Sequence, residues 1–296
     1  MTLAITHLSL RKLHPALGAE VSGVDLSRPL DPPTVAAIRD AWHRHHLLLF
    51  RGQPISDAQH VAFARNFAEL ELFPIGENRA GRAPEIFRVA NTDEDGRLRS
   101  PDSETWRYLS LIEFWHTDSS YRPVPSLGAI LRALEVPEEG GNTLFANLLA
   151  AYAALSEATK RRIDRLKVRH SFLFARSLRG LPPMKPEEAA SVPDVEHALV
   201  RVHPDREGQK SLYLSHCYMQ DVLGLPRSEA QRLIDDLHRH ATRPEFVYRH
   251  VWQKHDILMW DNRVTMHAVT PFNVGRDRRV MHRTALKGLE AVRSVA

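Results

Sequence analysis

Cysteine is nearly absent from this sequence, which contains only Cys217 among 296 residues. A single thiol cannot form an intramolecular disulfide, so the class of small secreted domains held together by disulfides is excluded. Residues 1–18 contain no long uncharged apolar core and no evident cleavage site, so we predict no signal peptide. Both observations suit a reducing compartment, and we expect a cytoplasmic protein.

Long apolar runs and long basic runs are also missing. No stretch approaches the roughly 20 apolar residues that a helix needs to cross a bilayer. The 40 Lys and Arg residues against 36 Asp and Glu residues give a net charge of +4, and the basic residues are scattered along the chain. We therefore expect neither a membrane nor a nucleic acid as partner, and the small positive excess fits a small anionic ligand.

The composition is that of an ordinary soluble domain. Apolar residues make up 43% of the chain and charged residues 26%, which is enough apolar material for one large core. No internal repeat is present. We predict a single domain spanning residues 1–296, and we expect it to form a homo-oligomer.

Three segments have the start signals of helices. Asp31 precedes two prolines and predicts the cap of a helix over residues 31–46. Ser56 and Gln59 form a capping-box pattern ahead of an apolar periodicity. Ser228 and Gln231 repeat that pattern and predict a helix over residues 228–241.

Most of the remaining ordered segments resemble strands, and no regular helical crossovers separate them. This arrangement argues against a doubly wound parallel sheet. It favours a mainly β fold in which two antiparallel sheets pack together, with helices outside: a jelly-roll core. The predicted strands are 19–26, 47–52, 128–136, 142–147, 166–172, 198–203, 211–215, 245–252, 256–262 and 278–286.

Two segments are predicted to be long loops. Residues 91–111 are charged and rich in turn formers, and residues 176–194 are rich in proline. Long irregular loops in a compact domain are often lids over an active site, although an ordinary surface excursion has the same composition.

The stretch FWHTDSSY, residues 114–121, contains a candidate metal site. In a strand His116 and Asp118 would point to the same face. An imidazole and a carboxylate side by side can hold a divalent metal, or they can form a structural hydrogen-bonded pair. Chance alone would produce roughly two pairs of a histidine and an acidic residue at this spacing in this composition. The other pair, His203 and Asp205, lies in a segment with proline and glycine that predicts a solvated turn.

A third candidate ligand lies far along the chain. Residues 256–272 predict a strand, a turn and a second strand that carries His267. Two histidines and one carboxylate leave the opposite face of a metal open, which is the arrangement that non-heme Fe(II) oxygenases need. The open positions would take dioxygen and a co-substrate, and a co-substrate with two acid groups, such as 2-oxoglutarate, would also need a cation.

Two arginines after His267 can supply such cations. If residues 278–286 form a strand, Arg279 and Arg283 share a face with Met281 between them. Guanidinium groups form bidentate pairs with carboxylates. Each arginine can therefore bind an anionic ligand, or each can form a salt bridge with one of the chain's own acids.

Taken together these motifs resemble the taurine/2,4-dichlorophenoxyacetate dioxygenase family, whose members depend on Fe(II) and 2-oxoglutarate. The resemblance extends over nearly the whole chain, and it is carried by LGAEVSGVDL, LLLFRGQPIS, FARNF, WHTDSSY, GAIL, GGNTLFAN, AAYAALS, FVYRHVW, MWDNRVTMH and RRVMHRTAL. It implies a double-stranded β-helix fold, with Fe(II) as cofactor and with 2-oxoglutarate and O2 as co-substrates.

The resemblance also implies roles for individual residues. His116, Asp118 and His267 correspond to the three iron ligands. Thr143 corresponds to the residue that hydrogen-bonds a 2-oxoglutarate carboxylate, and Arg279 corresponds to its salt-bridge partner. Arg283 matches the position that holds the anionic group of the substrate. Because the carboxylate ligand is present, hydroxylation is favoured over halogenation.

The residues expected around the substrate differ from those of the taurine enzymes. Phe73, Gly76 and Ile112 stand where those enzymes have polar side chains, so the pocket is expected to be more apolar. We predict an aryloxyalkanoate as substrate. Taurine, an alkylsulfonate or an alkylsulfate is the alternative within the family, and a non-catalytic barrel that binds a metal or an anion is the alternative outside it.

Overall fold

The computed structural model describes residues 8–72, 79–80, 83–205 and 208–295. Its central element is an eight-stranded sheet with the order β1-β2-β3-β14-β6-β16-β5-β4. Neighbouring strands in this sheet are antiparallel except for β2 and β3. The strands are β1 (Ser9–Lys12), β2 (Ala19–Ser22), β3 (Leu47–Phe50), β4 (Arg79–Ala80), β5 (Ala83–Ala90), β6 (Gly128–Glu135), β14 (Ile257–Asp261) and β16 (Val280–Leu286).

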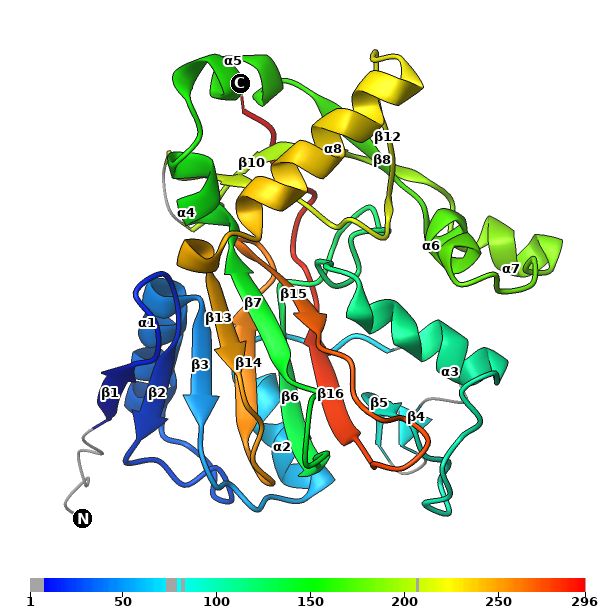
Figure 1. Ribbon diagram of the computed structural model, residues 1–296. Helices are drawn as coiled ribbons and strands as arrows, with labels where there is room; N and C mark the ends of the chain where they lie inside the picture. Colours follow the sequence, from blue (N-terminus) through cyan, green and yellow to red (C-terminus); the bar gives the residue numbers. More distant parts are fainter. Residues whose placement is uncertain (1–7, 73–78, 81–82, 206–207, 296) are drawn as a thin grey trace.

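A second, three-stranded sheet faces the middle of the first (Figure 1). It contains β13 (Val247–His250), β7 (Thr143–Asn147) and β15 (Thr265–Val269), all antiparallel. Phe145 of the small sheet and Trp260 of the large sheet are fully buried, with ring centroids 5.5 Å apart. The space between the sheets is therefore one apolar core.

The large sheet is buried on both faces at its strand β3, which is apolar at every position. In β3 the side chains of Leu47 and Leu49 enter the core between the sheets. Leu48 and Phe50 point the other way, as successive side chains on a strand must, and pack under two helices. These helices are α1 (Pro32–His45) and α2 (Asp57–Arg65).

Gly128 allows one of these helices to pack closely on the sheet. A Cβ atom at this position would lie 2.4 Å from the Trp260 carbonyl oxygen and 2.6 Å from the Trp42 ring of α1. The helix α1 can therefore approach β6 this closely only because Gly128 has no side chain.

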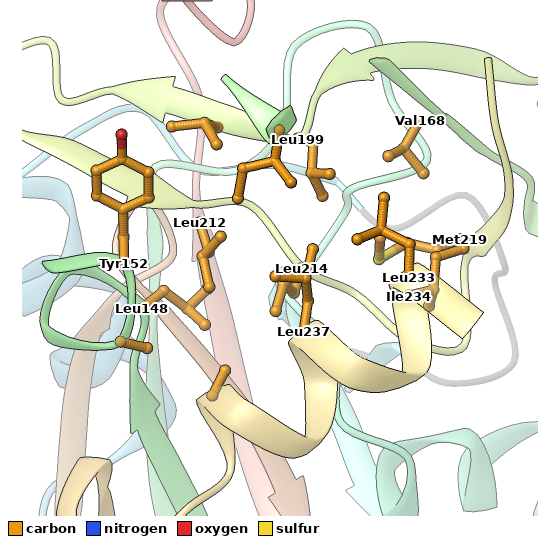
Figure 2. Packing of buried hydrophobic residues seen from close by; sticks show 14 of the residues in the cluster. Leu148, Tyr152, Val168, Leu199, Leu212, Leu214, Met219, Leu233, Ile234 and Leu237 are labelled. Atoms are coloured by element: carbon orange, nitrogen blue, oxygen red, sulfur yellow. The ribbon is translucent and has the colours of Figure 1, made fainter. Parts of the chain in front are cut away.

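A further layer forms a second core beside the two sheets (Figure 2). The helix α8 (Arg227–Ala241) buries Leu233, Ile234 and Leu237 against strands and against α4 (Leu148–Ala153). The strands of this layer are β8 (Lys167–His170), β9 (Val195–Ala198), β10 (Val200–Val202), β11 (Lys210–Leu212) and β12 (Met219–Val222). Shorter helices are α3 (Glu104–Leu109), η2 (Ser110–Glu113), α5 (Glu157–Ile163), α6 (Phe172–Leu178), α7 (Pro186–Ala190) and η3 (Pro244–Phe246).

The architecture agrees with the predicted arrangement of antiparallel sheets with flanking helices. Nine of the ten predicted strand segments contain an observed strand, and the tenth, 211–215, overlaps β11 at two residues. The predicted caps of the first two helices are confirmed: Asp31 accepts a hydrogen bond from the Thr34 amide, and Ser56 and Gln59 form a complete capping box. No helix in the described ranges is both long enough and apolar enough to span a membrane.

Two local predictions were wrong. The helix α8 begins at Arg227, with Pro226 at the cap position and no side-chain capping bond, so Ser228 lies inside its first turn. Because its ring fixes the φ angle near the helical value, Pro226 suits a helix start, and the helix begins one residue before Ser228. His203 is not in a solvated turn: it is 1% exposed, and its Nε2 lies 3.5 Å from an oxygen of buried Asp261.

Candidate active site

Three side chains that are far apart in sequence meet beside the core between the sheets. His116, Asp118 and His267 each offer one ligand atom, and these atoms lie within 4.8 Å of one another. The Nε2 atoms of His116 and His267 lie 4.0 and 3.9 Å from the oxygens of Asp118. All three residues are buried. This is the grouping that the sequence predicted.

Backbone pairing explains why these residues meet. His116 and His267 exchange two main-chain hydrogen bonds of 2.9 and 2.8 Å, so the segment of His116 is paired to β15 at this one point. The Thr117 hydroxyl points away from the site and bonds the carbonyls of Leu214 and Thr265. Asp118 then begins a turn. The segment is thus a single bridge followed by a turn, not the regular strand that was considered.

The two imidazoles are held in defined orientations. The Nδ1 of His116 donates to the Phe114 carbonyl at 2.8 Å, which leaves its Nε2 free to bind a metal. The ring of His267 stacks on Phe145 at 5.7 Å and lies 4.8 Å from the Trp260 ring. Both rings therefore present a nitrogen to the same space as Asp118.

The charge states of the three groups suit a divalent cation. Burial lowers the pKa of His116 and holds the pKa of His267 well below its usual value, so both rings are neutral at neutral pH. Burial alone would raise the pKa of Asp118, but the Arg283 guanidinium and the two histidines beside it outweigh burial and lower that pKa. Neutral imidazoles and an ionised carboxylate are the forms that bind metals.

Arg283 connects this cluster to the neighbouring pocket. Its Nη1 donates to Oδ1 of Asp118 in an ion pair, and its guanidinium lies 5.2 Å from the centroid of the Phe87 ring. The second oxygen of Asp118 and the Nε of Arg283 are buried and have no hydrogen-bond partner in the described part of the chain. Since guanidinium has five N–H donors, the bond to Asp118 leaves donors for another anion.

Arg279 occupies a different environment from Arg283. It is 2% exposed and forms no salt bridge with any described residue. Its Nε donates to the Gly141 carbonyl at 3.0 Å, and its Nη2 lies 3.5 Å from the Thr143 hydroxyl. Burial lowers its pKa to about 10, so it remains a cation at neutral pH. A buried cation without an acid partner is costly unless a ligand supplies the anion.

Thr143 is placed for hydrogen bonding at the start of β7. Its hydroxyl accepts from Trp252 Nε1 at 2.9 Å, and the residue is 1% exposed. The strand β7 pairs with β15, and Phe145 of β7 lies directly opposite His267 of β15. Thr143 and His267 therefore belong to adjacent strands of the small sheet.

A pocket opens from the cluster and is walled mainly by apolar and aromatic side chains. It contains about 540 Å³ of empty space, its open mouth included. His116, Asp118 and Arg283 supply charged or ligating groups on its lining, together with the hydroxyl of Ser119. The other lining residues are Phe87, Val89, Tyr108, Leu109, Leu111, Ile112, Tyr121 and Tyr218.

The predicted substrate residues are only partly accounted for. Ile112 lines the pocket as predicted. Phe73 and Gly76 lie outside the described residues. The sequence prediction missed the three pocket tyrosines, although Tyr121 lies within the motif that contains Asp118. It also missed Phe87 and Val89, which are on a strand that had not been predicted and which pair with Arg283 and Met281.

The two predicted loops contain short helices and contact each other. Residues 91–111 include α3, and Tyr108 and Leu109 at its end line the pocket. Residues 176–194 include α7. The guanidinium of Arg107 donates to the Arg179 carbonyl, and Arg179 pairs with Glu113 at 2.5 Å. Residues 176–194 therefore pack against the part of the pocket wall that residues 91–111 form.

Known proteins resemble this chain over nearly its full length. The sequence profile of the taurine catabolism dioxygenase TauD, TfdA family matches residues 9–285. The alpha-ketoglutarate-dependent 2,4-dichlorophenoxyacetate dioxygenase of Cupriavidus pinatubonensis is 34% identical, over 93% of this chain and 96% of that protein. An alkylsulfatase of Acinetobacter baylyi is 35% identical, over 95% of this chain and 85% of that protein.

A solved structure agrees with the sequence relatives. The crystal structure of AAD-2 in complex with Mn(II) and N-oxalylglycine superimposes with a TM-score of 0.88 at 36% identity. The match covers 97% of this chain and 99% of that one.

Proposed function

The chain belongs to the TauD/TfdA family and is a 2-oxoglutarate-dependent dioxygenase, and on that premise we propose that it hydroxylates an aryloxyalkanoate. The reaction consumes 2-oxoglutarate and O2 at Fe(II) and releases succinate and CO2. The observation that carries the proposal is the pocket, which joins a three-residue metal cluster and one guanidinium to walls that are otherwise apolar or aromatic except for Ser119. The alternative of a non-catalytic barrel is not retained, because the family is one of enzymes.

The residues at the cluster fit a divalent metal. Two neutral imidazoles, one ionised carboxylate and an Asp118 oxygen without a hydrogen-bond partner form the ligand set that non-heme Fe(II) oxygenases use. We assign His116, Asp118 and His267 as the iron ligands. The iron supplies the activation of O2 that the side chains cannot perform themselves.

Arg279 and Thr143 are assigned to 2-oxoglutarate. A buried guanidinium without an acid partner and a hydroxyl 3.5 Å from it form a complete recognition site for one carboxylate. Such a site would hold the distal carboxylate and orient the co-substrate. It would also relieve the desolvation cost of Arg279.

Arg283 is assigned to the anionic group of the primary substrate. Its guanidinium lines the pocket, has an unpaired Nε and is fixed over Phe87. The aromatic body of the substrate would lie against Ile112 and the pocket tyrosines, with Phe73 as a further predicted contact. Burying an aromatic ring in this way contributes roughly 2–3 kcal/mol by area.

The position of the anion determines which carbon is oxidised. With its carboxylate on Arg283 beside Asp118, the substrate presents the carbon next to that carboxylate to the metal cluster. In a phenoxyacetate this carbon also bears the ether oxygen. Hydroxylation there gives a hemiacetal, which breaks its C–O bond to release a phenol and an α-keto acid.

The remaining features of the proposal concern the whole chain. We assign the fold as a double-stranded β-helix jelly roll, which two facing antiparallel sheets support. Residues 1–296 form one domain, with 91–111 and 176–194 as lids over the site. A homo-oligomer and a cytoplasmic location remain predictions from the sequence.

Substrate preference tests this proposal. The enzyme should prefer phenoxyacetate to taurine by at least about tenfold in kcat/KM, a difference of about 1.4 kcal/mol in transition-state binding. The reason is that the described pocket walls offer no acid to the ammonium group of taurine other than Asp118, which already binds Arg283. Succinate release measured for both compounds with one enzyme preparation checks the ratio.

A short alkylsulfate is the necessary third substrate in that comparison. The alkylsulfatase relative makes sulfate esters the alternative class, and a sulfate also carries an anion that Arg283 can bind. Higher kcat/KM for the alkylsulfate than for phenoxyacetate would replace the aryloxyalkanoate assignment. Higher kcat/KM for taurine would contradict the argument from the apolar pocket.

A further inference from the structure

A second pocket lies where six parts of the chain meet. These are α1, the segment after α2, the segment before β6, the end of β10, the turn between β14 and β15, and the tail that follows β16. In Figure 1 this tail, in red, runs from the end of β16 toward the C-terminus. The pocket contains about 830 Å³ of empty space, its open mouth included, and it shares no lining residue with the pocket at the metal cluster.

Arg201 is the unusual side chain in this second pocket. It is 5% exposed, and its Nε is buried without a hydrogen-bond partner. Among the residues that the structure describes, none forms a salt bridge or a side-chain hydrogen bond with it. Its guanidinium lies 5.3 Å from the centroid of the Tyr213 ring, a favourable contact that does not neutralise the charge. Burying a guanidinium without an ion-pair partner is unfavourable for folding.

The acids near Arg201 are already engaged with other cations. Arg263 forms ion pairs with Asp205 and with Asp261, and the latter is fully buried. Glu290 pairs with Arg293 at 2.6 Å. Asp261 and Glu290 favour the positive charge of Arg201 through space, but no described acid forms a salt bridge with it.

A second cation on the lining also lacks an acid. The guanidinium of Arg39 donates only to the main-chain carbonyls of Asn66 and Phe67 within the described structure. The pocket therefore has two guanidinium groups, on Arg39 and Arg201, that form no salt bridge with any acid in the described part of the chain. Beside them it has an apolar surface formed by Phe67, Leu127 and Pro204.

We propose that this pocket is a second binding site, for a small organic anion with a carboxylate or phosphate head. The head pairs with Arg201 and Arg39, and the apolar part lies against Phe67 and Leu127. The ligand supplies the ion-pair partner that Arg201 does not have among the described residues. The site is separate from the catalytic one, because Arg279 and Arg283 take no part in it.

Calorimetric titration of the full-length chain with phenyl phosphate and with benzoate tests the proposal, with inorganic phosphate as a probe of the head alone. We expect saturable binding to the wild-type chain. Arg201→Met should weaken that binding at least tenfold, because it removes the charge and keeps the apolar stem. Without added anion the melting temperature of Arg201→Met should equal or exceed that of the wild type, since the variant has lost an unpaired buried charge.

Two matched variants make the outcome decisive. Arg232→Met removes an exposed charge from α8 and should leave binding unchanged. Arg283→Met should also retain it, because Arg283 lies in the other pocket. Binding that is lost in Arg283→Met and kept in Arg201→Met would place the anion in the catalytic pocket and overturn the proposal. Absence of saturable binding to the wild type would overturn it as well.

Discussion

Replacing His267 by alanine should lower the rate of succinate formation by at least about a thousandfold, equal to about 4 kcal/mol of barrier. The change removes one of the three groups whose ligand atoms lie within 4.8 Å of one another. His116 and Asp118 alone would leave the iron with an incomplete ligand set. Succinate released per enzyme under saturating 2-oxoglutarate and substrate is the measurement.

The same variant needs a test of its folding, because His267 is buried and stacks on Phe145. Circular dichroism should show the secondary structure of the wild type, with a lower melting temperature. His45→Ala, in the last turn of α1, is a matched control that should retain full activity. Turnover by a folded His267→Ala enzyme at a rate near that of the control would show that His267 is not a ligand.

Replacing Arg279 should weaken mainly the binding of 2-oxoglutarate, and replacing Arg283 should weaken mainly the binding of the organic anion. Arg279→Met should raise the KM for 2-oxoglutarate by roughly tenfold to a hundredfold, the range expected for a lost charged hydrogen-bond pair. Arg283→Met should raise the KM for the organic anion by a similar factor. Arg279 lies beside Thr143 and binds no acid, whereas Arg283 lines the pocket and contacts Asp118.

Steady-state kinetics with each ligand varied in turn distinguishes the two roles. Arg279→Met should also melt at the same or a higher temperature than the wild type in the absence of 2-oxoglutarate, because it removes a buried cation that has no described acid partner. Equal changes in both KM values for both variants would contradict the assignment of separate roles.

The metal cluster could be predicted from the sequence because its chemistry is rare and its residues are few. His116 and Asp118 alone were ambiguous, since the chain contains a second His-x-Asp pair. The structure separates the two pairs by their partners. His116 is joined to His267 by main-chain bonds, whereas His203 is buried beside Asp261, which Arg263 neutralises. Neither set of long-range contacts can be predicted from the residues next to each pair in the sequence.

The sheets were predictable for a different reason. The strand β3 is apolar at every position, and β14 is apolar at every position except its last, Asp261, because both faces of the sheet are covered. Continuous apolar runs of this kind are conspicuous in a sequence. The strand β5, with its polar and charged residues Glu85 and Arg88, has no such run and was missed. Its absence from the prediction also hid Phe87 and Val89, which complete the pocket.

Buried charges were the least predictable feature. Arg201 and Arg279 are both buried and form no salt bridge with any described residue, whereas Arg283 is paired with Asp118. The residues that flank these three arginines in the sequence do not show this difference. Whether an arginine meets an acid depends on which elements pack around it, so only the folded chain distinguishes an arginine in a salt bridge from a buried arginine without one.

The most direct measurement of the central claim is an anaerobic spectroscopic titration. Fe(II) and then 2-oxoglutarate would be added under nitrogen to the purified wild-type chain, to Arg279→Met and to His267→Ala. We expect the wild type to develop a weak visible charge-transfer band that saturates at one equivalent of each ligand. Arg279→Met should need more 2-oxoglutarate to reach the same band, and His267→Ala should not develop it. A wild-type chain that binds both ligands without the band, or a His267→Ala chain that develops it at full strength, would contradict the assignment of His116, Asp118 and His267 as the iron site.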